Sequence, residues 1–419
     1  MKKFAYLFAV IGIACMFTAC SNDDDPAMPG ASIPAKTYTA ADGLTLKLDG
    51  TEAVGQIVSF TPSNDGKATL SIKGAPLDIS SIIGGMMGGS KADQTPNLTL
   101  PTSSVIPGSA EVTIPVELTG DASSCSFAGS TETTYCTFAY EGKVSEGALD
   151  LNLSDIKLKN TSIAGTYDLM SDAPLRIVWE GDDFQFEAYG QKVDYRLSYL
   201  IQMMVGMAPM IDIDNEKVTV TQALAAVLKS VTFGEDGSVT AVYADTETPG
   251  LPEVTAPKGL ARYVIDGNNT IRLFLSPEAI IAAQASKADD NTNEESEAFD
   301  PSVILGKINI EGLISKVVTT LSAGIPLHYG DVVNDAVEPD PNAVSFYLGK
   351  ETILPILKDV APICEDPELR NQIVDLAISQ AGEMGPLAQM FMAPALEAFP
   401  NIVNNTTTEV QFGLNLKKQ

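Results

Sequence analysis

The chain has 419 residues, and 54 Asp and Glu against 26 Lys and Arg give it a formal net charge of -28 at pH 7. A surface this acidic repels phosphate backbones, so we expect no nucleic-acid partner. A single histidine removes every His-based zinc motif, and we expect neither a metal nor a cofactor. The length is sufficient for two domains with separate cores.

The first twenty residues predict export from the cytoplasm. Two lysines precede an apolar run, Phe4 to Phe17. The run is shorter than the ~20 residues of a membrane-spanning helix and matches the central part of a signal peptide. Small residues then precede Cys20, which resembles the processing site of bacterial lipoproteins. We therefore expect a signal peptide at 1–19 and lipid on Cys20; the alternative is an ordinary cleaved signal.

Acidic residues follow the lipidation site directly. The segment Ser21 to Asp25 cannot pack against an apolar surface, so residues 20–36 predict a flexible tether. Acidic residues in this position also resemble the surface-export signal of lipoproteins from gut bacteria of the Bacteroides type. That resemblance implies the outer face of the outer membrane. Because the acidic body cannot adhere to anionic lipid, we expect membrane attachment through the N-terminal lipid alone.

Residues 37–160 predict a mostly antiparallel β-domain, either a sandwich or a barrel. Leu44 to Leu48 alternate apolar and polar residues, which is typical of a half-buried strand. Asp65 and Gly66 form a turn signal between two further alternating runs and predict a hairpin. The strand patterns fall at 44–48, 57–60, 68–72, 112–118, 137–140 and 148–158. Residues 77–89 predict a flexible apolar insertion.

Two cysteines of this domain suggest a covalent link. Cys125 and Cys136 are separated by ten residues, with Gly129 to Thr131 midway between them. A hairpin turning there would bring the two side chains together in a compartment that permits oxidation, so we predict a disulfide. The alternative is two free thiols in a pair of strands. Cys364 stands alone and is expected to be a small buried hydrophobic residue.

Residues 161–419 predict a second β-body packed with apolar helices, so the chain as a whole is expected to be α+β. The strand patterns fall at 175–179, 184–188, 231–239, 263–265, 271–275 and 411–416. The helical patterns fall at 195–210, 220–228, 304–321, 353–360 and 373–399. Residues 285–298 are acidic and polar, and they predict a disordered loop between the strands and the late helices.

The strand-turn-strand pattern resembles the calycin-like, lipocalin-type β-barrel domains. The residues that carry this resemblance are Val58 to Phe60 with Asp65 and Gly66, Gly165 to Tyr167, and Phe233 with Asp236 and Gly237. Lipocalins proper have Gly-x-Trp where this chain has Tyr167. The whole chain is also similar to a family of Bacteroides lipoproteins of unknown function, which implies no activity. Its composition is similar to that of tubular lipid-binding proteins of the bactericidal permeability-increasing type.

Methionines are concentrated in the predicted helices. Methionine side chains adapt to irregular apolar surfaces and suit a cavity for an apolar ligand. An ordinary helical core is the alternative. The candidate cavity residues are Met203, Met204, Met207, Met210, Met390 and Met392.

The remaining motifs predict no catalytic residue. His328 lies in an apolar strand without a Gly-x-Ser-x-Gly motif, which indicates a structural role. Residues 84–91 end in Ser-Lys, whereas a phosphate-binding loop requires Gly-Lys followed by Ser or Thr, so they are not expected to bind phosphate. Residues 212–216 carry alternating acids but lack the glycine and distal Glu of a calcium loop. These residues are therefore expected to form a solvated turn. The acids at 180–183 could hydrolyse glycosides as paired carboxylates, but acidic turns are expected at this composition. Trp179 indicates a core position.

These observations lead us to expect a non-enzymatic binding protein, anchored by lipid in the outer membrane. Its ligand would be a small apolar or amphipathic molecule such as a fatty acid, a lipid or a bile-acid-like compound. The alternative is a structural or adhesive surface protein that binds glycan or protein, and an enzyme comes third. A carrier requires an enclosed apolar cavity, an adhesin an exposed patch, and an enzyme convergent polar groups, near His328 or the Asp212 turn.

Overall fold

Strands dominate the computed structural model, with 46% strand and 28% helix, arranged as an eight-stranded antiparallel barrel and several further sheets. It describes residues 28–63, 65–78, 99–188, 190–207, 209–213, 216–246, 248, 250–267, 269–285, 310–333, 340–380 and 385–419. The predicted signal peptide, Cys20, most of the tether, the motif at 84–91 and the predicted loop from 286 onward lie outside these residues.

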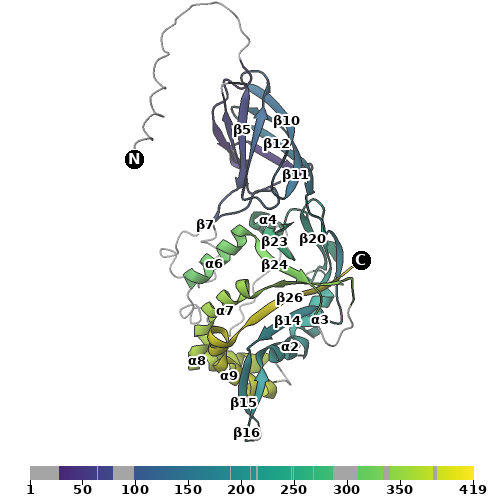
Figure 1. Ribbon diagram of the computed structural model, residues 1–419, viewed down its shortest axis with the longest axis vertical. Helices are drawn as coiled ribbons and strands as arrows, with labels where there is room; N and C mark the ends of the chain where they lie inside the picture. The colour runs from purple at the N-terminus through teal and green to yellow at the C-terminus, as the bar shows by residue number, and fades with distance from the viewer. Residues whose placement is uncertain are drawn as a thin grey trace, which may run out of the picture.

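The first part of the chain forms two sheets at one end of the molecule (Figure 1). The four-stranded sheet has the order β1 (Lys36–Tyr38), β4 (Gln56–Pro62), β5 (Lys67–Gly74) and β8 (Glu111–Glu117). The six-stranded sheet has the order β3 (Thr51–Glu52), β2 (Leu44–Leu48), β12 (Leu149–Leu158), β11 (Cys136–Ser145), β10 (Ser124–Glu132) and β9 (Thr119–Gly120). A short helix, η1 (Ala40–Asp42), and the pair β6 (Leu77–Asp78) and β7 (Thr99–Leu100) complete this part. The strands and the hairpin predicted here are confirmed.

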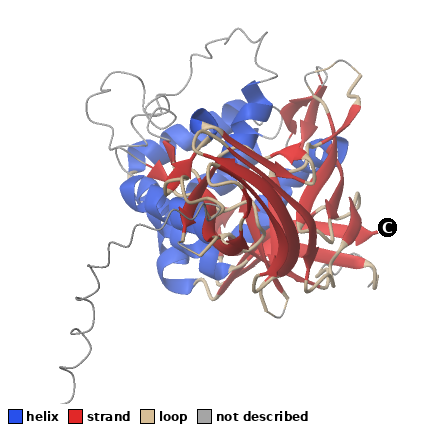
Figure 2. Ribbon diagram, turned by 90° about the horizontal axis from the view of Figure 1, so that it is seen from above, coloured by secondary structure: helices blue, strands red, loops and turns tan. Residues whose placement is uncertain are grey.

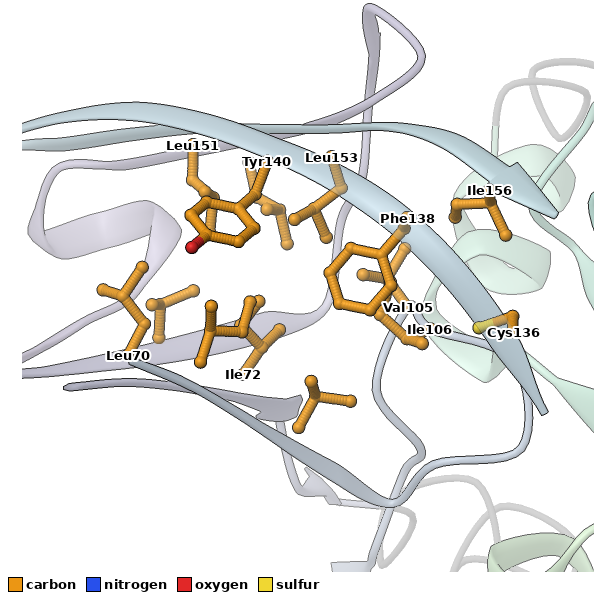
Figure 3. Close-up of a cluster of buried hydrophobic side chains, with 14 of the residues drawn as sticks. Leu70, Ile72, Val105, Ile106, Cys136, Phe138, Tyr140, Leu151, Leu153 and Ile156 are labelled. Atoms are coloured by element: carbon orange, nitrogen blue, oxygen red, sulfur yellow. The ribbon is translucent and has the colours of Figure 1, made fainter. Parts of the chain in front are cut away.

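The alternation of apolar and polar residues explains how these two sheets face each other. Inward side chains of β5 such as Leu70 and Ile72 lie opposite Tyr140 and Leu151 of the six-stranded sheet (Figure 3). Each of these residues is 8% exposed or less, while their strand neighbours point outward. Burial of this apolar surface, at about 25 cal/mol per Å², holds the two sheets together.

One pairing departs from the predicted antiparallel pattern. β2 runs parallel to β12, with Leu46 opposite Leu151. Both strands have an alternating pattern, and alternation fixes which face of a strand is buried but leaves its direction open. The parallel pair joins strands about a hundred residues apart in the sequence, as the contact of Gly50 with the Asn152 side chain also shows.

The predicted disulfide between Cys125 and Cys136 is wrong, because both cysteines are free and buried. The pairing of β10 with β11 continues to Glu132 and Thr137, so the hairpin turns at residues 133–135. Cys125 lies opposite Val144 at the far end of the same hairpin. Eight residues of strand, at about 3.4 Å each, therefore separate the cysteines by about 27 Å, whereas a disulfide needs Cα atoms within about 7 Å.

Free thiols can be counted chemically. In a chain carrying Cys15→Ser and Cys20→Ser, unfolding in guanidinium without reductant should expose three reactive thiols, those of Cys125, Cys136 and Cys364. The folded chain should react slowly, since burial raises the pKa of Cys136 and raises that of Cys364 to about 11. Dithiothreitol should leave the melting temperature unchanged. A single reactive thiol after unfolding would show that the bridge exists.

The second part closes into the barrel. Its strands follow in the order β13 (Gly165–Leu169), β19 (Leu228–Phe233), β20 (Ser238–Ala244), β22 (Ala261–Ile265), β23 (Thr270–Leu275), β24 (Ile325–Gly330), β25 (Ala343–Leu348) and β26 (Glu409–Lys418). Pairing of β13 with the end of β26, Tyr167 opposite Lys418, closes the ring. The first part of β26 pairs along the same edge with β14 (Leu175–Glu180). The short strand β21 (Glu253–Thr255) pairs with β20. The strand predictions in this part are confirmed.

Aromatic side chains occupy the barrel interior. Phe233 stacks on Phe346 at a ring separation of 5.0 Å and meets Tyr263 edge to face at 5.1 Å. Tyr167 packs edge to face against both phenylalanines. An eight-stranded barrel is just wide enough for side chains to fill it, so these rings occupy the space in which a lipocalin-type barrel would hold its ligand.

Helices pack along one side of the barrel and at its far end (Figures 1 and 2). They are α2 (Leu197–Met207), α3 (Val220–Val227), α4 (Pro277–Ala285), α6 (Ile310–Ala323), α7 (Lys350–Glu365), α8 (Pro367–Gln380) and α9 (Gly385–Asn401), followed by the π-helix η4 (Ile402–Thr406). The hairpins β15 (Asp183–Ala188) with β16 (Gln191–Arg196) and β17 (Pro209–Ile213) with β18 (Glu216–Thr219) flank α2. α2, α7, α9 and β15 share a second apolar core around Trp179.

The helix predictions are confirmed with shifted ends. The helix expected at 195–210 spans only α2, because Tyr195 belongs to β16 and Met210 to β17. The helix expected at 220–228 is α3, whose N-cap Thr219 forms a capping box with Gln222. The part of the predicted helix at 304–309 lies outside the described residues, and α6 covers the rest.

The two-sheet body and the barrel share one apolar core. Val105 and Ile106 of the first part belong to the same buried cluster as Tyr263 and Ile271 of the barrel. Tyr263 lies in the strand β22 and is fully buried at this junction. The two parts are therefore packed against each other through this shared cluster.

Glycine permits the close approach of the two parts. Gly237, with φ +79°, follows Asp236 in the β19–β20 turn. A Cβ atom there would lie 2.8 Å from Cγ of Pro107 and 3.1 Å from the carbonyl oxygen of Tyr263. Alanine would therefore meet both a left-handed backbone and a steric clash.

The substitution Gly237→Ala should destabilise the chain more than a control glycine that has only the backbone constraint. Gly267, with φ +87°, has no atom within 4 Å of the added Cβ. We expect Gly267→Ala to cost about 1 kcal/mol of unfolding free energy and Gly237→Ala about 3 kcal/mol. Urea unfolding followed by circular dichroism measures both. Equal losses would show that the junction can relax around the added methyl group.

Candidate functional site

The candidate methionines differ in their burial. Met203 and Met204 are partly buried against the second core. Met207 and Met390 are 61% and 43% exposed, and Met392 is partly buried in α9. For Met210, in β17, only the backbone is described. The hollows described below are lined by other residues.

His328 links the barrel to a helix. Its Nδ1 lies 3.2 Å from Oγ1 of Thr270 on the neighbouring strand, and its Nε2 lies 2.6 Å from Oε1 of Glu351 in the first turn of α7. Hydroxyl, imidazole and carboxylate thus form a line, but hydrolysis would also need a substrate pocket at the hydroxyl and oxyanion donors. A hollow of about 370 Å³ between α6 and α7 is lined by Glu351 and not by His328 or Thr270. This geometry favours the structural role.

The His328–Glu351 contact should appear in the pH dependence of stability. Burial raises the pKa of Glu351, but the hydrogen bond from His328, a backbone hydrogen bond and the His328 charge outweigh it and lower the pKa overall. A lowered folded-state pKa stabilises the fold above the ordinary value of 4.5, and this contribution is lost as the pH falls through the folded-state pKa.

We therefore expect Glu351→Gln to flatten the fall in unfolding free energy on acidification below pH 4.5. Urea unfolding at a series of pH values measures it. The exposed Glu253→Gln in β21 serves as the control and should leave the slope unchanged. A wild-type slope in Glu351→Gln would contradict the role of this contact.

The acidic turns do not form a metal site in the described part of the chain. Asp212 lies in the β17–β18 hairpin opposite Lys217, and Asp214 lies outside the described residues. No group of three or more His, Cys, Asp or Glu among the described side chains is placed to hold a metal ion. Of the acids at 180–183, Asp182 is fully buried and accepts a hydrogen bond of 2.6 Å from the backbone N–H of Ser198.

Trp179 is a core residue, as predicted. It is 4% exposed, and its Nε1 donates a hydrogen bond of 2.9 Å to Oγ1 of Thr407. Phe399 and Phe412 pack edge to face against it. The indole is therefore not exposed for stacking on a sugar.

A cavity of about 200 Å³ lies where the two-sheet body meets the barrel. The strands β2, β3 and β4 form one wall, and β20, β22 and the start of α4 form the other. Its walls are apolar in part, while hydroxyl, amide and charged groups lie among them. The lining residues are Leu48, Asp49, Thr51, Glu52, Ala53, Val54, Gln56, Val105, Ile156, Asp236, Ser238, Lys258, Gly259, Arg262, Ser276 and Ala279.

Arg262 is the distinctive residue of this cavity. It precedes the fully buried Tyr263 in β22, so alternation along the strand directs its side chain away from the barrel core and into the cavity wall. Among the described residues its guanidinium has neither a hydrogen bond nor an ion pair. Burial lowers the pKa of Arg262 to about 10, although the charge of Asp236 opposes this shift.

The charge of Asp236 favours the protonated form of Arg262, but no hydrogen bond joins the two side chains. Its carboxylate accepts hydrogen bonds from the backbone N–H and the hydroxyl of Ser238, at 2.9 and 2.5 Å. Lys258 lies 3.7 Å from its other oxygen. Arg262 therefore retains five N–H donors for which this part of the protein supplies no acceptor.

A second poorly solvated group lies beside the cavity. Glu278 of α4 packs against Gly55, which adjoins the lining residue Gln56. Its Oε1 is buried and has no hydrogen-bond partner among the described residues. Burial raises the pKa of Glu278, and hydrogen bonds from its own backbone and from Thr102 oppose it only in part. Perturbed ionisable groups gathered at one cavity are typical of functional sites.

Arg262 gives this cavity a group that can bind an anion, and the carboxylates of Asp49, Glu52 and Asp236 also line it. A guanidinium without an acceptor binds a carboxylate through two parallel hydrogen bonds. Leu48, Val105 and Ile156 offer apolar surface to the rest of the ligand. An apolar cavity of about 150 Å³ holds a benzene molecule, so the space suits a short-chain or aromatic acid.

Sequence reasoning did not single out Arg262. A charged residue between Ala261 and Tyr263 in a strand that ends in Val264 and Ile265 is a visible signal. Whether this arginine has a hydrogen-bond partner depends on the position of Asp236, which only the folded chain shows.

Comparison with known proteins finds no matching family model, no matching curated protein and no matching solved structure. Within the described residues, no helix has both the length and the hydropathy needed to cross a membrane.

Proposed function

We propose that this chain is a lipid-anchored, surface-exposed outer-membrane protein that binds a small amphipathic anion, without catalysis, in the cavity between the two-sheet body and the barrel. The observation that carries the binding proposal is Arg262, a guanidinium without a partner in the described chain, facing a partly apolar cavity of about 200 Å³. The lipid anchor rests on the sequence around Cys20. In the same proposal the chain is α+β, and its two facing sheets are a β-sandwich.

The position of the cavity also favours a binding role. The aromatic cluster around Phe233 and Phe346 fills the barrel interior, so the carrier hypothesis needs another location. The junction supplies one with a cation at its wall and apolar residues beside it. A fatty acid of a few carbons or an aromatic acid matches both the charge and the size.

Replacing Arg262 should separate binding from stability. Arg262→Leu removes the cation that would hold the carboxylate, so we expect the affinity for hexanoate or benzoate to fall by at least about tenfold. The same change removes a poorly solvated charge without a partner and should raise the unfolding free energy by about 1 kcal/mol. Calorimetric titration and urea unfolding measure the two effects.

Lys192→Gln, which removes an exposed cation on β16, is the matched control and should change neither quantity. A drop in stability in Arg262→Leu would mark the arginine as a structural residue. Failure of both acids to bind to the wild-type chain at about 10 mM would rule out this ligand class.

A further inference from the structure

The outer face of the six-stranded sheet carries a second hollow, open to solvent and about 670 Å³ in volume. It lies on the opposite face of the sheet from the apolar core, and it is separate from the junction cavity. The lining residues are Thr45, Lys47, Thr119, Ser126, Phe127, Ala128, Glu141, Gly142, Lys143, Asp150, Leu151 and Asn152.

The strand register arranges these side chains in two rows. One row runs across five strands through Thr45, Asp150, Lys143, Ser126 and Thr119, which lie directly opposite one another. The other runs across four strands through Lys47, Asn152, Glu141 and Ala128. Five strands at a spacing of about 4.8 Å span about 19 Å, so the rows match an extended ligand.

Charges in the two rows are balanced and unpaired. The two lysines, Lys47 and Lys143, balance the charges of Glu141 and Asp150. The hollow is therefore locally neutral in a chain of net charge -28. Oppositely charged side chains facing each other across a sheet normally pair. Among the described residues, however, no ion pair holds any of these four, and only Glu141 accepts a side-chain hydrogen bond, of 3.2 Å from Asn152.

Small residues keep the hollow open. Ser126, Ala128 and Thr45 place little volume between the long charged side chains. Gly142 lies beneath them, and Phe127 packs against it, where an added Cβ would lie 2.4 Å from the ring. Phe127 is 3% exposed and belongs to the core, so it offers no surface for stacking.

We propose that this hollow binds a neutral oligosaccharide. Hydroxyl groups both donate and accept, so a sugar chain can satisfy the ammonium and carboxylate groups together. An apolar ligand would strip four charges of water without replacing their hydrogen bonds. An acidic chain would meet Glu141 and Asp150 and the negative charge of the whole protein. A peptide strand pairs with sheet edges rather than with a sheet face.

The test uses the full chain and four neutral probes, maltohexaose, cellohexaose, mannohexaose and xylohexaose, in calorimetric titrations up to about 10 mM. Without an aromatic platform, we expect one of them to bind with a dissociation constant between about 0.1 and 5 mM. Lys143→Ala should weaken that binding about tenfold. Ala128→Trp should abolish it by filling the hollow.

Matched controls keep the result specific. Thr69→Trp places the same side chain at an exposed position of the four-stranded sheet and should bind the sugar as the wild type does. Arg262→Leu should also bind it normally, so failure here and failure of the anion site are distinguishable. Three results would overturn the proposal: no binding of any neutral probe, binding that Ala128→Trp leaves intact, or tighter binding of hexagalacturonate than of the neutral chains.

Discussion

The apolar contact between the two-sheet body and the barrel is the constraint on which the other features depend. The segment from Val105 to Gly108 packs against β22 and the β19–β20 turn, and Tyr263 of β22 is fully buried in the same apolar cluster. Gly108, with φ +74°, lies so close to Tyr135 and Val264 that a Cβ atom there would overlap both side chains. Close packing of this kind transmits strain and leaves little freedom for the two parts to rotate. The walls of the junction cavity are therefore held in fixed relation.

This contact also determines where the proposed ligand site lies. A barrel of eight strands either fills its interior with side chains or holds one small molecule, and here Tyr167, Phe233 and Phe346 fill it. The packed barrel then serves as a rigid wall for a cavity outside it. Arg262 and Tyr263 are neighbours in one strand. Arg262 points to the cavity, and Tyr263 points to the core. The strand β22 thus contributes a residue to the stable barrel interior and, next to it, a poorly solvated cation to the cavity.

Most strands could be predicted from the sequence because alternation is a local property. Leu44 to Leu48 and the hairpin at Asp65 and Gly66 needed only their own residues. The partners of strands are not local: the parallel pairing of β2 with β12 and the closure of β13 on β26 depend on contacts between distant segments. The disulfide prediction failed because it placed the turn at Gly129, whereas pairing continues to Glu132. For the candidate site, the state of Arg262 depends on Ser238 and Lys258 binding Asp236, which no spacing in the sequence reveals.

The placement of β26 has a consequence for the order of folding. The strands of the two-sheet body all fall between Lys36 and Leu158, so that body can form from one continuous stretch. The barrel closes only when β26 pairs with β25, β13 and β14, and the bond from Gln419 to Asp168 joins residues 251 positions apart. Contacts between such distant segments form slowly, and until they form the edges of the other barrel strands remain unpaired. During synthesis, the incomplete barrel would therefore be the part most exposed to aggregation, and a chain that stops before β26 would be a substrate for proteases.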